Sequence, residues 1–186
     1  MNFHKHIIAV FVVCFSLEGH ASEHLKINEL MASNISAQFN SDTSDFVDWI
    51  ELFNSGDAPI ILSGLFLTDD FADPHKWMIP DNAVIEAGGY YIVWADGLTH
   101  DNHTSYKLSG SGEQVGLFYP DGRVIDTITF GIQRNDVSFG RFPDGGDDWH
   151  YFSIPTCGFP NSSPGLSSNA QLSKPICTPE GGLYSG

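Results

Sequence analysis

Short apolar runs, separated at regular intervals by turn residues, occupy most of the sequence after residue 24. The runs are rich in β-branched and aromatic residues, and no long segment repeats its apolar residues with the 3.6-residue period of a helix. This pattern is typical of an all-β sandwich or barrel, and the even spread of apolar residues predicts one core. The expected strands are 25–31, 48–54, 60–68, 75–79, 90–95, 106–108, 114–119, 123–130, 138–142 and 149–154.

Three of these runs carry further expectations. Residues 25–31 alternate apolar and polar side chains, which predicts an edge-like strand in which Glu29 caps backbone amides at a strand crossing. Residues 90–95 are apolar throughout, which predicts burial on both faces of the strand. The Pro-Asp-Gly turn at 120–122 predicts a hairpin between the two runs that flank it.

The four tryptophans lie in four separate runs, mostly with apolar neighbours, so we expect them to anchor the core. They are Trp49, Trp77, Trp94 and Trp149. Trp149 follows two aspartates and is the one we expect to be exposed, where its ring offers a platform for a ligand such as a sugar.

The first 21 residues have the pattern of a secretory signal peptide. A weakly basic start at 4–6 precedes a short apolar run at 7–17, and the small residues at 19–21 predict cleavage after Ala21. The run is too short to span a bilayer, and no later run approaches that length. The mature chain is therefore expected to be secreted, cell-surface or periplasmic, and to contain no transmembrane segment.

Asp and Glu outnumber Lys and Arg by 23 to 8, which gives a net charge of −15. This balance excludes nucleic acid as a partner, because phosphates need a basic surface. Calcium binds carboxylates from flexible loops, so three acidic groups are candidates for a calcium site, although aspartate is also a common turn and cap residue. The main candidate ligands are Asp42, Asp45 and Asp48 in one loop and Asp69, Asp70 and Asp73 in another, and the third group is Asp144, Asp147 and Asp148.

Once the signal peptide is removed, two cysteines remain, Cys157 and Cys177. In an oxidising compartment an even pair predicts a disulfide, unless Cys177 pairs with a cysteine outside this chain. Residues 22–160 form the predicted sandwich domain. Residues 161–186 begin as a Ser/Pro-rich linker and then enter what we interpret as the start of a further, truncated domain.

Signals for an active site are weak. His100 and His103 would offer zinc two imidazoles, but no further His or Cys pair has suitable spacing. The sequence has neither a G-x-S-x-G nor an H-E-x-x-H motif. We therefore expect no enzymatic activity.

A series of motifs in a fixed order resembles the bacterial branch of the lamin-tail domain family, over roughly residues 24–160. The motifs are I-N-E-L-M-A-S-N (27–34), D-W-I-E-L-F-N (48–54), L-S-G-L-F-L-T-D-D (62–70), K-W-M-I-P (76–80), Y-I-V-W-A-D-G (91–97), Y-K-L-S-G-S-G-E-Q-V-G-L-F (106–118), D-T-I-T-F-G (126–131) and S-F-G-R-F-P-D-G-G-D-D-W (138–149).

This resemblance implies an immunoglobulin-like β-sandwich without catalytic residues, of the kind found as an accessory module of secreted or surface-attached proteins. The tail P-I-C-T-P-E-G-G-L-Y-S-G (175–186) resembles the opening of a small β-sandwich that follows catalytic domains in chitobiase-like enzymes.

The sequence leaves three functions open. The first is a non-catalytic interaction or scaffold module that positions a neighbouring domain or contacts an envelope or extracellular partner. The second is a carbohydrate-binding module, which the tryptophans and acidic loops favour. The third is a small metal-dependent hydrolase, which rests only on the histidines and aspartates.

Overall fold

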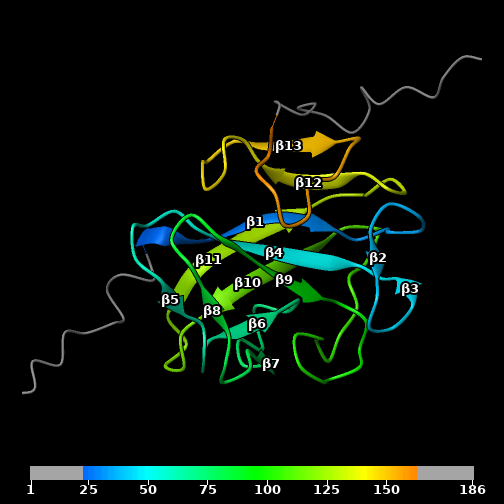
Figure 1. Cartoon of the computed structure of the whole chain (residues 1–186). Helices are drawn as coiled ribbons and strands as arrows, with labels where there is room; N and C mark the ends of the chain where they lie inside the picture. The colour runs from blue at the N-terminus through cyan, green and yellow to red at the C-terminus, as the bar shows by residue number, and fades with distance from the viewer. Residues whose placement is uncertain (1–22, 163–186) are drawn as a thin grey trace, which may run out of the picture.

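A computed structural model describes residues 23–162, and these residues form an all-β fold (Figure 1). The strands are β1 Leu25–Met31, β2 Phe39–Asn40, β3 Asp45–Phe46, β4 Trp49–Asn54, β5 Ile60–Ile61, β6 Phe66–Thr68, β7 Trp77–Met78, β8 Val84–Ile85, β9 Tyr90–Trp94, β10 Glu113–Phe118, β11 Val124–Phe130, β12 Ser138–Arg141 and β13 Trp149–Phe152.

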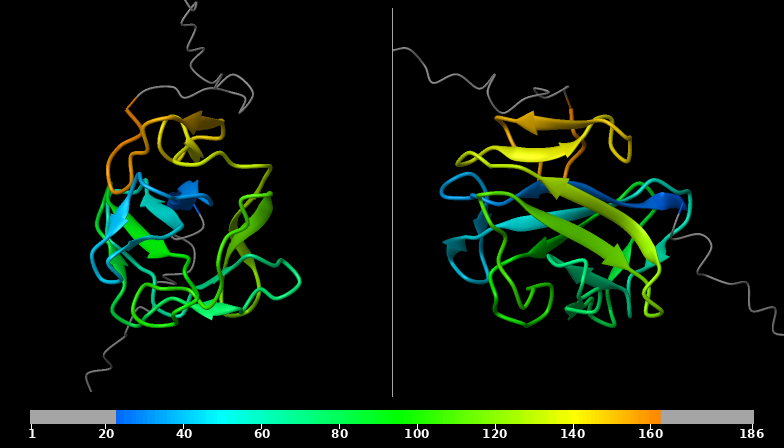
Figure 2. Two further views of the ribbon diagram at one scale, coloured as in Figure 1. Left: turned by 90° about the vertical axis from the view of Figure 1, so that its right-hand side faces the viewer. Right: turned by 180° about the vertical axis from the view of Figure 1, so that it is seen from behind.

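Two antiparallel sheets face each other and enclose the core (Figure 2). One has the strand order β13-β12-β1-β4-β9, and the other has the order β11-β10-β6-β7. Large aliphatic side chains from both sheets are fully excluded from solvent, and each contributes roughly 1.5–3 kcal/mol to folding. They include Leu25, Ile27, Leu30, Ile50, Leu52, Leu67, Val115 and Leu117.

The alternation of side chains in β1 and β4 divides the five-stranded sheet into an inner and an outer face. Leu30 pairs with Ile50 on the inner face, and Glu29 pairs with Glu51 on the outer face. The register shifts between Ile27 and Glu29, which is the mark of a β-bulge. Strand β1 lies between β12 and β4, so the expectation of an edge-like first strand is wrong.

The hairpin predicted around residues 120–122 is confirmed, because β10 and β11 pair along their lengths. The single strand expected over residues 60–68 is wrong. Gly64 adopts a positive φ of 79°, which turns the chain and separates β5 from β6. β5 therefore pairs with β8, and β6 joins the four-stranded sheet.

Burial of residues 90–95 on both faces is also a wrong expectation. Strand β9 is at the edge of its sheet, and among its residues only Val93 is fully excluded from solvent. Residues 106–108, expected to form a strand, contribute one isolated bridge, between Asp96 and Lys107. The two-residue strands β2, β3 and β8 were not predicted.

Candidate functional site

Two glutamates lie side by side on the outer face of the five-stranded sheet. Glu29 of β1 and Glu51 of β4 are directly opposite each other in the strand register. Both side chains are 0% exposed. Placing two carboxyl groups together out of water is unfavourable unless their oxygens find hydrogen-bond donors or a proton. The surroundings of this pair therefore decide what it can do.

Ser138 of β12 donates its hydroxyl to Glu29 Oε1. Further donors come from a segment near the end of the described chain, Thr156–Asn161, which we call the C-terminal clasp. In Figure 1 the clasp (orange) descends from β13 to β1, and its amides donate to side chains of both β1 and β4. The backbone N–H of Thr156 donates to Glu29 Oε1 (3.2 Å), and the hydroxyl oxygen of Thr156 is hydrogen-bonded to Glu29 Oε2 (2.8 Å). The N–H of Gly158 donates to Glu51 Oε2 (2.7 Å).

A third carboxylate, Asp144, completes the cluster from the turn between β12 and β13. It accepts hydrogen bonds from the hydroxyl of Tyr90 (2.6 Å) and from the backbone N–H of Asn161 in the clasp (3.1 Å). The side-chain amide of Asn28 donates to both Asp144 (3.0 Å) and Glu51 (2.9 Å). Asn28 thereby joins two of the three carboxylates.

Burial dominates the electrostatics of the cluster. Loss of solvation raises the pKa of Glu29 and raises the pKa of Glu51 to about 8, and the neighbouring Asp144 charge adds to both shifts. The same burial, with Glu51 and Glu29 close by, raises the pKa of the Cys157 thiol in the clasp. The cluster is thus a set of acidic groups that favours holding a proton.

This arrangement serves to hold the clasp against the sheet. Each of the three carboxylates accepts at least one hydrogen bond from the clasp, and all three belong to elements of the folded sandwich. Hydrogen bonds to ionised groups contribute about 1.5–3 kcal/mol each when they are well satisfied. The predicted capping role of Glu29 is confirmed, because its carboxyl group accepts the Thr156 amide.

Sequence reasoning missed Glu51. A signal for Glu51 exists, because it occupies the same position in its strand motif (W-I-E-L) as Glu29 does in I-N-E-L. If the two motifs pair in antiparallel register, their glutamates meet. Asp144 was predicted only as part of an acidic loop, and its place between Pro143 and Gly145, the ordinary composition of a turn, gives no sign that it meets the glutamates.

The first predicted calcium group is divided between a hairpin turn and a strand entry. Asp42 and Asp45 are exposed in the β2–β3 hairpin, and Asp45 caps the N–H of Phe46. Asp48 is half-buried and accepts the N–H of Asn34 (2.9 Å). Burial raises the pKa of Asp48 to about 6.

The second predicted calcium group lies in the turn between β6 and β7. Asp69 forms an ion pair with Lys76 (2.5 Å), and Asp70 caps the N–H of Ala72. Asp73 is exposed in the same turn. Within residues 23–162, no three His, Cys, Asp or Glu side chains are grouped as a metal site. Calcium binding at either loop stays a prediction.

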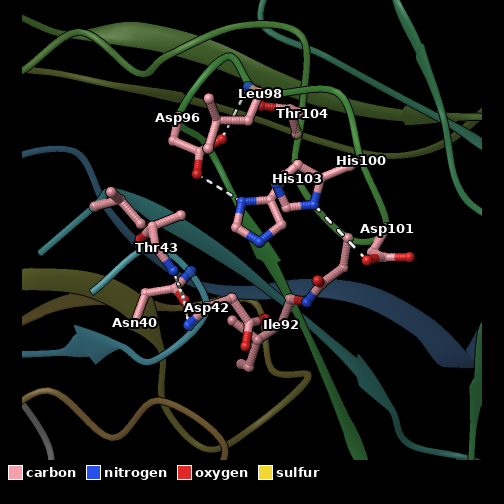
Figure 3. A network of polar contacts seen from close by, with 12 residues as sticks. Asn40, Asp42, Thr43, Ile92, Asp96, Leu98, His100, Asp101, His103 and Thr104 are labelled. Carbon is pink, nitrogen blue, oxygen red and sulfur yellow. Dashed lines mark hydrogen bonds and ion pairs between the residues drawn. The ribbon is translucent and has the colours of Figure 1, made fainter. Parts of the chain in front are cut away.

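The rings of His100 and His103 contact each other, with centroids 4.2 Å apart (Figure 3). His103 is fully buried, and its Nδ1 lies 2.6 Å from Asp96 Oδ2. His100 is half exposed, and its Nδ1 lies 3.7 Å from Asp101. Each imidazole thus has its own acidic neighbour, so a structural role accounts for both histidines without a zinc ion.

Trp49 and Trp77 are buried at 0% and 8% exposure, as the prediction of core anchors requires, whereas Trp94, in the edge strand β9, is only half-buried. Trp149 is half-buried, stacks on Phe139 with ring centroids 5.0 Å apart, and carries the Arg141 guanidinium 4.7 Å from its ring. Cys157 forms no disulfide within the described chain, and Cys177 lies outside it. The predicted disulfide therefore remains a prediction.

The fold defines a class of protein, the immunoglobulin-like β-sandwich domains. The family model of the Lamin Tail Domain matches residues 18–131. The chain therefore belongs to the lamin tail domain family, whose members are immunoglobulin-like interaction domains. A comparison with curated proteins finds no match. No helix within residues 23–162 has the length and apolar character needed to cross a membrane.

Proposed function

We propose that this protein is an exported, non-catalytic interaction module whose sandwich fixes the C-terminal clasp on its sheet. A neighbouring domain joined there would be positioned relative to β1 and β4. The signal-peptide pattern of residues 1–21 supports export to the periplasm, the cell surface or the medium.

The observation that carries this proposal is the clasp. A flexible linker would leave its backbone amides to water, whereas three clasp amides donate to three carboxylates of the sandwich. The side-chain amide of Asn161 also donates to the carbonyl of Arg141 (2.6 Å). The clasp is therefore fixed at both of its ends, which supports a role in positioning a neighbouring domain.

A reporter domain inserted after Ser162 in the full chain tests the proposal. Fluorescence anisotropy decay should show the reporter tumbling with the sandwich as one body. Glu51→Ala removes the acceptor of the Gly158 amide and should release the reporter, while Glu86→Ala, at an exposed position, should not. Where Glu51→Ala fails to fold, Thr156→Val provides a milder variant. Independent tumbling in the unmodified protein would refute the positioning role.

The carbohydrate-binding alternative has less support. A sugar platform needs an open aromatic face, but Trp149 packs against the core together with Phe139 and contacts Arg141. Arg141 is itself held by Asp126 and is 6% exposed. A protein partner, or a neighbouring domain, therefore agrees better with the described surface.

A further inference from the structure

We propose that the C-terminal clasp is a proton-controlled latch, which closes on the sheet while Glu29 carries a proton and loosens when Glu29 becomes charged. The inference rests on the clasp described above and adds a form of regulation to its proposed positioning role.

The hydroxyl of Thr156 shows where the proton belongs. This hydroxyl has a single hydrogen but contacts two acceptor oxygens, Glu29 Oε2 (2.8 Å) and the side-chain carbonyl of Asn161. It cannot donate to both at once. If Glu29 is protonated on Oε2, its O–H donates to Thr156 Oγ1, and the Thr156 hydroxyl donates to Asn161. All three groups are then satisfied.

The neighbouring glutamate cannot take that proton as easily. Both oxygens of Glu51 face N–H groups, which only donate: the Asn28 side-chain amide (2.9 Å) and the Gly158 backbone amide (2.7 Å). The Asn28 amide cannot turn round, because its oxygen already accepts the N–H of Gly145 (2.9 Å). Burial raises the pKa of both glutamates, that of Glu51 to about 8, which by itself would favour a proton on Glu51. The hydrogen-bond geometry decides between them: Glu51 faces only donors, so a single proton shared by the pair resides on Glu29 and Glu51 carries the charge.

The acidic groups nearest to Glu29 act in one direction, and a histidine in the same register, His150 of β13, lies two strands away beyond Gly140. Glu51 of β4 and Asp144 of the β12–β13 turn are acidic, while Tyr90 of β9 and Cys157 of the clasp can only become negative. Arg141 of β12 is directed at Asp126 on the other face of the sheet. Ionising Glu29 would thus place another negative charge in a buried acidic cluster, and burial raises its pKa accordingly.

The direction of the pH effect follows from this. A carboxyl group that binds its proton more tightly in the closed clasp stabilises the clasp fully at pH values below about 4.5, its ordinary pKa. That contribution is lost as the pH rises through the higher pKa of the closed state. The clasp should be tight in acid and looser in alkali.

Two glutamine variants at the paired positions give opposite expectations. Glu29→Gln places an amide N–H₂ where the proposed O–H lies, so it should keep the clasp closed at every pH. Glu51→Gln places an N–H₂ against a group that also donates, so it should open the clasp at every pH. An ionised Glu29 in the closed clasp would make both substitutions equally disruptive.

The test measures amide hydrogen exchange by NMR on the full chain, from pH 5 to pH 9. The quantities compared are the protection factors of the Thr156 and Gly158 amides. In the unmodified protein these should fall at least tenfold with rising pH, while the Leu117 amide in β10 stays protected. In Glu29→Gln they should stay constant, and in Glu51→Gln they should be at least tenfold lower at pH 5. A flat profile in the unmodified protein, or loss of protection in Glu29→Gln, overturns the proposal.

A ¹³C titration of the Glu29 carboxyl group gives a second readout, which a purely structural role would not move. The reporter anisotropy separates this proposal from the positioning role. A reporter that tumbles freely at all pH values refutes positioning, whereas a reporter held equally at pH 5 and pH 9 refutes the latch and leaves positioning intact.

Discussion

The Arg141 guanidinium and the Asp126 carboxylate join the two sheets of the sandwich. Nη2 of Arg141 in β12 lies 3.1 Å and 3.0 Å from the two carboxylate oxygens of Asp126 in β11. The same carboxylate accepts the N–H of Ile27 at the β1 bulge (2.9 Å), and Arg141 Nε donates to the carbonyl of Ile27 (2.8 Å). The Arg141–Asp126 ion pair thus also supplies the hydrogen-bond partners of the Ile27 backbone in a third strand, β1.

Asp126→Asn should strongly destabilise the fold. The substitution leaves the Arg141 side chain, which is 7% exposed, without its counter-charge. Removing one member of a buried ion pair costs about 3–5 kcal/mol, which urea unfolding monitored by tryptophan fluorescence would measure. Asp121→Asn is the matched control, since Asp121 pairs with Arg123 at the surface and should change little. Equal effects of the two substitutions would contradict the inter-sheet role.

Gly140→Ala should destabilise the sheet, because the outer face has no room for a methyl group there. A Cβ at Gly140 would lie 2.9 Å from Cγ of Glu29 and 3.1 Å from the carbonyl oxygen of Asn28. Such overpacking costs about 1–3 kcal/mol. Gly131→Ala meets nothing within 4 Å and serves as the control. Thermal unfolding of both variants checks this, and an unchanged Tm for Gly140→Ala would show that β12 can move away from β1.

Asp48 makes stability depend on pH between about 4 and 6. Burial raises its pKa from 3.8 to about 6, so the folded protein binds a proton more tightly than the unfolded chain. The stabilisation is complete below pH 4 and is lost as the pH rises through 6. Asp48→Asn retains an oxygen that accepts the Asn34 amide, and should be about 1–2 kcal/mol more stable than the unmodified protein at pH 7.

The comparison at pH 4 provides the internal control for Asp48. There both proteins carry a neutral side chain at this position, so their unfolding free energies should converge. A constant difference from pH 4 to pH 7 would mean that the substitution changes packing rather than ionisation.

Calcium binding at the acidic loops is tested by adding millimolar calcium to EDTA-treated protein. A site filled to a hundredfold its dissociation constant adds about 2.7 kcal/mol, which raises Tm by roughly 5 to 10 °C in a domain of this size. Asp42→Asn/Asp45→Asn and Asp70→Asn/Asp73→Asn should each abolish the rise if their loop holds the ion. The absence of any rise would leave these aspartates as turn and cap residues.

Strands with a local pattern could be predicted from the sequence. The alternation in β1 and the Pro-Asp-Gly turn before β11 are properties of a few consecutive residues, and the structure confirms both elements. Strands β2, β3 and β8 have two residues each, too few to show any period. The partial burial of β9 depends on its place at a sheet edge, which its own residues do not encode.

The candidate site could be predicted only in part. The capping role of Glu29 follows from a carboxyl group in an apolar strand, which needs a donor when buried. The partners of Glu29 could not be predicted from the sequence. Glu51 meets it through the register of two strands, and Thr156 lies 127 residues further along the chain. The clasp has no periodic pattern, so nothing in residues 156–161 marks them as part of a site.

The central position of β1 also determines when this domain can finish folding. β1 needs β12 on one side, and its Glu29 needs the clasp above it, yet both are synthesised more than 100 residues later. Contacts of such sequence separation form slowly, because a long loop must close before they contribute. During synthesis, β1 must wait for β12 and for the clasp, so this sheet cannot be completed until residue 161 has emerged.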